Sequence, residues 1–176
     1  MTMAKGRPDH SEAKEYYWRY MDRIQDDDIV AALERNGRET AALLRSVGEE
    51  QSKHRYAEGK WSIREATLHV TDAERVFASR ALWFARGFTT ELPSFDQDVA
   101  VAASGAEARS WSSLIEEFEA ARASTIAMFR GLPDDAWMET GVASGNPFSV
   151  RALAYMIAGH ADYHNAILRE RYLATV

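Results

Sequence analysis

Two histidines lie four positions apart in a strongly apolar stretch near the end of the chain, LAYMIAGHADYHNAIL, which spans Leu153 to Leu168. Apolar residues there recur at spacings of three and four, which predicts a helix whose core-facing stripe includes His160 and His164. Side chains at positions i and i+4 of a helix have Cβ atoms about 5–6 Å apart. Two imidazoles at this spacing can bind one metal ion through metal–nitrogen bonds of about 2.0–2.1 Å.

A third histidine, His69, is predicted to face the core from an earlier helix. Its stripe consists of small and apolar side chains: Ala66, Ala73, Val76 and Phe77. Two nitrogens rarely hold an ion without a third protein ligand, so His69 is the candidate that completes a set with His160 and His164. His10 and His54 occur in polar segments, and we exclude them from the candidate site.

Three neutral imidazoles would leave the charge of a divalent ion unneutralised and at least one coordination position open for water or substrate. Such an ion could polarise a carbonyl, lower the pKa of bound water to about 7, or hold an incoming thiol as thiolate. This ligand type suits zinc, nickel or iron, and affinity alone does not choose among them. The alternative is that the histidines are packed, hydrogen-bonded core residues that bind no metal.

Acidic residues flank His69 on the same predicted helix, and each has a structural alternative. Asp72 lies one turn after His69 and could orient a ligand or act as a base, or it could pair with Arg75 on the surface. It is the candidate auxiliary residue. Glu65 lies one turn before His69, but the capping box that it forms with Ser62 already explains it.

Other polar and aromatic residues also have two interpretations. Arg122 and Arg151 could bind an anionic substrate near the mouth of the bundle, or they could be solvated. Asp96 and Asp98 could close over the site, or they could form a turn. Three tryptophans are expected in the core or at an interface rather than in a cofactor cage: Trp61, Trp83 and Trp111.

Four long helices are predicted to position these side chains, because apolar residues recur with helical spacing over most of the chain. They are expected at about residues 28–50, 62–86, 110–131 and 149–172. Ser62 and Ser149 are the expected N-caps of the second and fourth helices. A shorter helical leader is expected at about 8–21, and the region 88–109 is expected to be irregular.

The fold class predicted from this pattern is all-α: an up-down-type four-helix bundle with a short N-terminal helical leader. At 176 residues and 46% hydrophobic residues, the chain has the size and composition of one domain. We expect residues 1–25 to form a leader that packs on the bundle, and residues 26–176 to form a single bundle domain.

Composition excludes several classes of protein. The chain has no cysteine, so it can form neither a disulfide nor a thiolate metal site. Its net charge of −6 provides no basic stripe, which argues against nucleic acid and against an anionic membrane surface as partners. No apolar run is long enough to span a bilayer, and no secretory signal is visible, so a cytoplasmic protein is expected.

Four segments of the chain together resemble the DinB-like superfamily, the damage-inducible four-helix proteins related to the YfiT-type metal-dependent hydrolases. They are GKWSIREATLHVTDAERVFASRALWFARG, LPSFDQD, EFEAARASTIAMFRGLPDDAW and SVRALAYMIAGHADYHNAILRERY. The resemblance extends from Leu33 to Tyr172. Its most specific part is one histidine after the KWS helix start and an H-x-x-x-H pair in the last helix, here His69, His160 and His164.

The resemblance implies a bundle that binds a divalent metal through those three histidines, with nickel or zinc favoured and iron or manganese as further candidates. It also implies a homodimer and a link to stress response. Similar members include thiol-dependent transferases and isomerases. Two functions are therefore expected: an enzyme that activates water or a low-molecular-weight thiol for a small-molecule substrate, or a non-catalytic, metal-stapled module that binds a protein partner.

Overall fold

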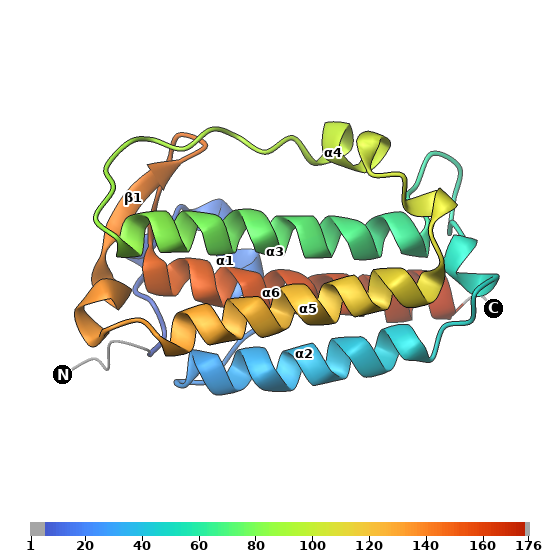
Figure 1. The fold of residues 1–176 in the computed structure, drawn as a ribbon, viewed down its shortest axis with the longest axis horizontal. Helices are drawn as coiled ribbons and strands as arrows, with labels where there is room; N and C mark the ends of the chain where they lie inside the picture. The colour runs from blue at the N-terminus through green and yellow to red at the C-terminus, as the bar shows by residue number, and fades with distance from the viewer. Residues whose placement is uncertain (1–5, 175–176) are drawn as a thin grey trace.

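Four long helices form a bundle in the computed structural model, which describes residues 6–174 (Figure 1). They are α2 (Ile29–Arg45), α3 (Ile63–Ala85), α5 (Trp111–Arg130) and α6 (Val150–Ile167). A π-helical segment, Leu168–Leu173, continues α6. Short 3-10 helices follow α2 and α5, at Gln51–Lys53 and Asp134–Met138. No helix within residues 6–174 combines the length and the apolar character that crossing a membrane requires.

Side-chain caps mark the starts of the long helices. The Asp28 carboxylate accepts hydrogen bonds from the backbone N–H groups of the first turn of α2. Ser62 and Glu65 form the complete capping box predicted for α3. Ser149 caps α6 by accepting a hydrogen bond from the N–H of Ala152. These caps satisfy N–H groups that have no partner within the helix, which explains why the predicted starts of α3 and α6 are confirmed.

The helices do not alternate in direction throughout, which corrects the up-down prediction. Figure 1 shows α3 and α5 running the same way. Their N-terminal ends lie together, because Nη1 of Arg64 in α3 donates to the carbonyl of Arg109, just before α5, at 2.7 Å. Further along, Arg122 of α5 pairs with Glu74 of α3. Two parallel neighbouring helices need a connection that returns along the whole bundle.

The connection between α3 and α5 returns over the outside of α3 and is partly helical (Figure 1). It contains α4 (Gln97–Ala103) and a 3-10 turn (Ala106–Ala108), so the prediction of an irregular region at 88–109 is wrong in part. Asp96 starts α4 by accepting hydrogen bonds from the N–H groups of Asp98 and Val99. Because α4 lies over α3, it can cover the side chains of α3 that face the connection.

A two-stranded antiparallel sheet precedes α6, which corrects the all-α prediction. Strand β1 (Thr140–Ala143) pairs with β2 (Asn146–Ser149). The two turn residues, Ser144 and Gly145, have φ values of 55° and 68°. Tight hairpins favour such positive φ values because the resulting turn matches the twist of the strands. Each strand is only four residues long, too short to show an alternating pattern clearly in the sequence.

The N-terminal leader is divided between a 3-10 turn, His10–Glu12, and helix α1, Glu15–Met21, rather than forming the single predicted helix. Trp18 and Met21 are buried in the hydrophobic core that α1 shares with α6. The two backbones approach so closely that a Cβ atom at Gly159 would overlap with the carbonyl of Tyr20. This contact places the aromatic side chains of α1 beside the middle of α6.

The core consists of two hydrophobic clusters at opposite ends of the bundle. One includes Leu33, Phe84 and Trp137, and the other includes Leu44, Trp111 and Phe118. Buried polar side chains occur between and beside these clusters, among them three arginines paired with carboxylates and two of the predicted histidines, His69 and His160. Hydrophobic packing therefore explains the two clusters but does not explain these buried polar side chains.

Candidate metal centre

The three predicted histidines converge. Helix α3 contributes His69, and consecutive turns of α6 contribute His160 and His164. The Nε2 atoms of His69 and His160 are 3.3 Å apart. One potential ligand atom from each of the three residues lies within 4.8 Å of the other two. Because two of the histidines come from one helix, α3 needs to contribute only one residue for the group to form.

The spacing of the nitrogens fits a shared ion. Two nitrogens bound to one tetrahedral zinc at about 2.0–2.1 Å would be about 3.4 Å apart. The separation between His69 and His160 is close to this value, and the candidate ligand atom of His164 lies within 4.8 Å of the other two. The Nδ1 atom of His69 is buried and has no hydrogen-bond partner within residues 6–174. A buried polar atom without a partner is costly, and an ion bound at Nε2 would leave the imidazole proton on Nδ1, so the fit to a metal rests on the three converging nitrogens.

Burial keeps all three imidazoles neutral. It lowers the pKa of His69 to about 4, with a smaller opposing effect from the Asp98 carboxylate. It lowers the pKa of His164 to about 3, and repulsion from His69 adds to this effect. The pKa of His160 is lowered well below its ordinary value by burial and by both neighbouring histidines. Neutral imidazoles have free lone pairs at neutral pH, which is the form that binds a metal.

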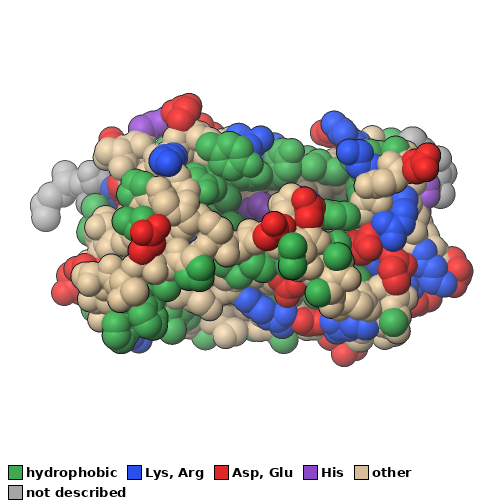
Figure 2. Space-filling view, turned by 90° about the horizontal axis from the view of Figure 1, so that it is seen from above, with side chains coloured by type: hydrophobic (Ala, Val, Ile, Leu, Met, Phe, Trp, Pro, Cys, Tyr) green, Lys and Arg blue, Asp and Glu red, His purple; other side chains and the backbone are tan. Residues whose placement is uncertain are grey.

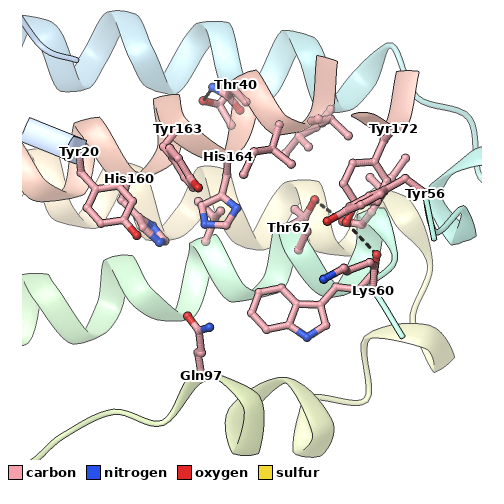
Figure 3. Close-up of a pocket in the computed structure, with 18 of the residues that line it drawn as sticks. Tyr20, Thr40, Tyr56, Lys60, Thr67, Gln97, His160, Tyr163, His164 and Tyr172 are labelled. Carbon is pink, nitrogen blue, oxygen red and sulfur yellow. Dashed lines mark hydrogen bonds between the residues drawn. The ribbon is translucent and has the colours of Figure 1, made fainter. Parts of the chain in front are cut away.

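A cavity of about 450 Å³ lies against this cluster, with His160 and His164 in its wall. Figure 3 shows both histidines projecting from α6 toward the cavity, with Gln97 extending from α4 on the opposite side. Viewed from the side of α4, a histidine side chain is visible near the middle of the surface, with acidic side chains beside it (Figure 2). The cluster is therefore reachable from outside, unlike a sealed structural site.

Aromatic side chains surround the histidines, a role that the sequence pattern did not predict. Tyr20 of α1 contacts the ring of His160 edge-on, with centroids 5.5 Å apart, and Tyr163 makes a similar contact with His164 at 5.4 Å. Trp61, which was expected in the core or at an interface, is half-buried and tilts against His69 at 4.8 Å. Trp111 is buried as expected and donates to two carbonyls at the end of α2. The available signal for Tyr20 was the cluster of tyrosines in the leader.

Asp72 does not join the histidines. Its Oδ1 accepts a hydrogen bond from Nη1 of Arg75 at 3.3 Å, and the same guanidinium pairs with Glu117 at 2.5 Å. Burial raises the pKa of Asp72, and the Arg75 charge opposes this rise. The two acids of the connection have different roles: Asp96 caps α4, whereas Asp98 lines the cavity. Asp98 is thus the carboxylate best placed to act near His69.

The two arginines proposed as anion ligands from the sequence have carboxylate partners. Arg122 is buried and donates from Nε and Nη2 to Glu74, and from Nη1 to Asn36 and the carbonyl of Leu33. Arg151 is buried and donates from Nε to Glu12 at 2.7 Å. Neither side chain is solvated, and neither lines the cavity. Both therefore tie elements together, and the expectation that they bind a substrate anion is wrong.

The fold and the site together define a class of protein: a helical bundle with parallel neighbours, a long crossover connection and a group of three neutral histidines beside an open cavity. The model of the DinB superfamily matches residues 32–168, and the chain belongs to this superfamily. The resemblance noted in the sequence is confirmed.

Among solved structures, the chain is similar to YfiT from Bacillus subtilis, described as a probable metal-dependent hydrolase with an unusual four-helix bundle topology. The sequences are 16% identical, the alignment covers 96% of this chain and 92% of that chain, and the TM-score is 0.73. At this identity the likeness establishes the fold. No curated protein sequence matches this chain.

Proposed function

We propose that the protein binds one divalent metal ion through His69, His160 and His164 and acts as a metal-dependent enzyme on a small molecule. The observation that carries the proposal is the convergence of three neutral imidazoles, two of which line the wall of an accessible cavity. Membership of the DinB superfamily and the likeness to YfiT, described as a probable metal-dependent hydrolase, support it. Nickel and zinc are the proposed metals.

An ion held by three neutral ligands would supply a Lewis acid that lowers the pKa of water or of a thiol. Residues of the chain would position the histidine rings and the substrate around this ion. Tyr20 and Tyr163 fix the histidine rings from the side of α1 and α6. Gln97 and Asp98 of α4 offer an amide and a carboxylate to orient a substrate or hold a proton. Because α4 lies over this side of α3, it would also restrict the access of bulk water to the histidines.

The cavity suits a small polar molecule with an apolar portion. Its volume lies within the range of about 300–1,000 Å³ that is usual for small-molecule sites. Five tyrosines contribute to its wall, and Arg19 and Lys60 add cationic groups. Since the chain has no cysteine, thiol chemistry would need a low-molecular-weight thiol from solution. The proposed reactions are therefore hydrolysis or S-transfer from such a thiol.

The deciding experiment is elemental analysis of untagged protein. About one nickel or zinc per chain is expected in the wild type, and none in the triple variant His69→Ala, His160→Ala, His164→Ala. His10→Ala, which removes an exposed histidine outside the cluster, is the control and should retain the metal. Equal metal in the wild type and the triple variant, or no metal in the wild type after it has been supplied, would overturn the proposal.

Cobalt substitution separates the two reactions. A low-molecular-weight thiol that binds the cobalt protein as thiolate should produce a charge-transfer absorption, which supports S-transfer. Turnover of esters or amides without such a spectral change supports hydrolysis.

The alternative of a non-catalytic metal staple has one observation in its favour: the group that can hold an ion, within residues 6–174, contains no carboxylate. A staple would join α3 to α6, and removing the ion would lower the melting temperature without changing the binding of any small molecule. The homodimer expected from the resemblance is part of the proposal, and light scattering of the purified protein tests it.

A further inference from the structure

One of the buried arginines lies in an environment that differs from those of the others. Four arginines within residues 6–174 are buried, and three of them have a carboxylate partner: Arg64 with Glu49, Arg122 with Glu74, and Arg151 with Glu12. The fourth, Arg80 of α3, is only 6% exposed. No carboxylate in this part of the chain pairs with it.

The hydrogen bonds of Arg80 use one of its three nitrogens. Nη2 donates to the carbonyl of Pro93 and to Oγ of Ser144, both at 2.9 Å. Nε and Nη1 make no hydrogen bond within residues 6–174. Glu91, which lies close in sequence to Pro93, instead accepts a hydrogen bond from the N–H of Gly145 at 3.1 Å. The guanidinium is therefore held in place by neutral acceptors, with donors to spare.

A buried cation without a counter-charge is unfavourable, because it loses its hydration and gains no opposite charge in return. Burial lowers the pKa of Arg80, and the opposing electrostatic contribution comes only from the Tyr17 hydroxyl, which is uncharged at neutral pH. The other three buried arginines offset this cost with a carboxylate. For Arg80, an anionic ligand in the adjoining crevice would supply the missing negative charge.

Arg80 faces a crevice of about 360 Å³ between α3 and the connection that passes over it. In Figure 1 this connection runs along the outer side of α3. Beside Arg80, the wall is mainly apolar: Val76, Trp83, Leu92, Pro93 and Phe95. The indole nitrogen of Trp83 is itself buried without a hydrogen-bond partner. The crevice thus combines a cation with free donors and an aromatic surface.

We propose that this crevice is a binding site for the carboxylate or phosphate group of a small molecule with an apolar body. The oxyanion accepts hydrogen bonds from Nε and Nη1 of Arg80, an arrangement in which a guanidinium can bind two oxygens at once. The apolar body packs on Trp83 and Phe95. The site is distinct from the histidine cluster and does not depend on the proposed metal.

The two sites are nevertheless close. The Cζ atom of Arg80 lies 6.0 Å from the centre of the Phe77 ring, and that ring lies 5.9 Å from the ring of His160. Phe77 therefore separates the anion site from the histidine cluster. The same connection covers both, with Pro93 over one and Gln97 over the other.

Binding is tested by NMR of the full-length ¹⁵N-labelled protein, with the indole N–H signal of Trp83 assigned from the variant Trp83→Phe. The probes are inorganic phosphate, acetate, phenyl phosphate and benzoate. A saturable shift of this signal is expected, with tighter binding of the phenyl compounds. A response to phosphates alone, to carboxylates alone or to both supports the site and identifies its oxyanion. No saturable shift with any of the four probes overturns the proposal.

Arg80→Met should weaken binding about tenfold or more, because it removes charge-assisted hydrogen bonds. Arg38→Met, which removes an exposed arginine of α2, is the matched control and should bind like the wild type. If Arg80→Met does not fold, Arg80→Lys keeps the charge, loses the planar fork and should still bind more weakly. Undiminished binding in the folded Arg80 variant overturns the proposal.

The same titrations with His160→Ala separate this site from the metal centre. Retained anion binding in that variant is expected, whether or not the wild type binds metal. Loss of binding in His160→Ala would place the anion at the histidine cluster and overturn the separate site.

Discussion

Lowering the pH from 7 to 5 should destabilise the metal-free protein through its buried histidines, and His69 offers the clearest test. In the unfolded chain an imidazole binds its proton near pH 6.5, whereas in the fold burial lowers the pKa of His69 to about 4. Between these two values the unfolded state binds more protons than the folded state. The stability that neutral His69 contributes is therefore fully present above pH 6.5 and is lost as the pH falls toward 4.

The size of the effect follows from the pKa difference. Each pH unit spent between the two pKa values costs about 1.4 kcal/mol per group, so one histidine costs about 2 kcal/mol between pH 6.5 and pH 5. His69 is almost fully buried, so solvent screens this effect little. For a domain of this size, about 2 kcal/mol is a large part of a stability of about 5–15 kcal/mol.

Urea unfolding of metal-free wild type and of His69→Gln, each at pH 7 and pH 5, measures this contribution. The wild type should lose about 2 kcal/mol more than His69→Gln over this interval. His10→Gln, which removes an imidazole outside the cluster, controls for the loss of one histidine from the chain. Equal losses in wild type and His69→Gln would refute the conclusion that burial keeps this imidazole neutral.

Three further perturbations test the packing around the site. Arg122→Met should lower the free energy of unfolding by about 3–5 kcal/mol, because it leaves the buried Glu74 carboxylate unpaired; the double variant with Glu74→Met should recover much of this loss in urea unfolding. Gly159→Ala should displace α1 and cost about 1–3 kcal/mol, with weaker metal binding in calorimetry because Tyr20 moves away from the cluster. Asp72→Asn should leave metal stoichiometry unchanged in elemental analysis, since its carboxylate hydrogen-bonds to Arg75 and does not join the histidines.

Local patterns in the sequence predicted the long helices and the cluster of three histidines. Ser62 with Glu65, and Ser149, mark helix starts through contacts within four residues, which need no knowledge of the fold. The spacing of His160 and His164 likewise places both rings on one face of any helix. His69 was found because the core-facing stripe of α3 can be identified from the apolar residues around it.

Contacts between distant segments decided the remaining features. The direction of α5 relative to α3 depends on the route of the long connection, and helical periodicity is the same for parallel and antiparallel neighbours. The hairpin before α6 is too short for its pattern to outweigh the surrounding helical signal. Asp98 lines the cavity because α4 folds back over α3, whereas the pairing of Asp72 with Arg75 is a local contact that the sequence had offered as one of two alternatives.

The arginines illustrate the same division most clearly. Their positions in predicted helices are alike in the sequence, yet Arg122 and Arg151 meet carboxylates from other elements, whereas Arg80 meets a carbonyl and a hydroxyl. Residue type and helical spacing determined that the chain would form a bundle with three histidines facing inward. Only the tertiary structure decided which charges are neutralised, because the partner of a buried charge comes from a segment far away in the sequence.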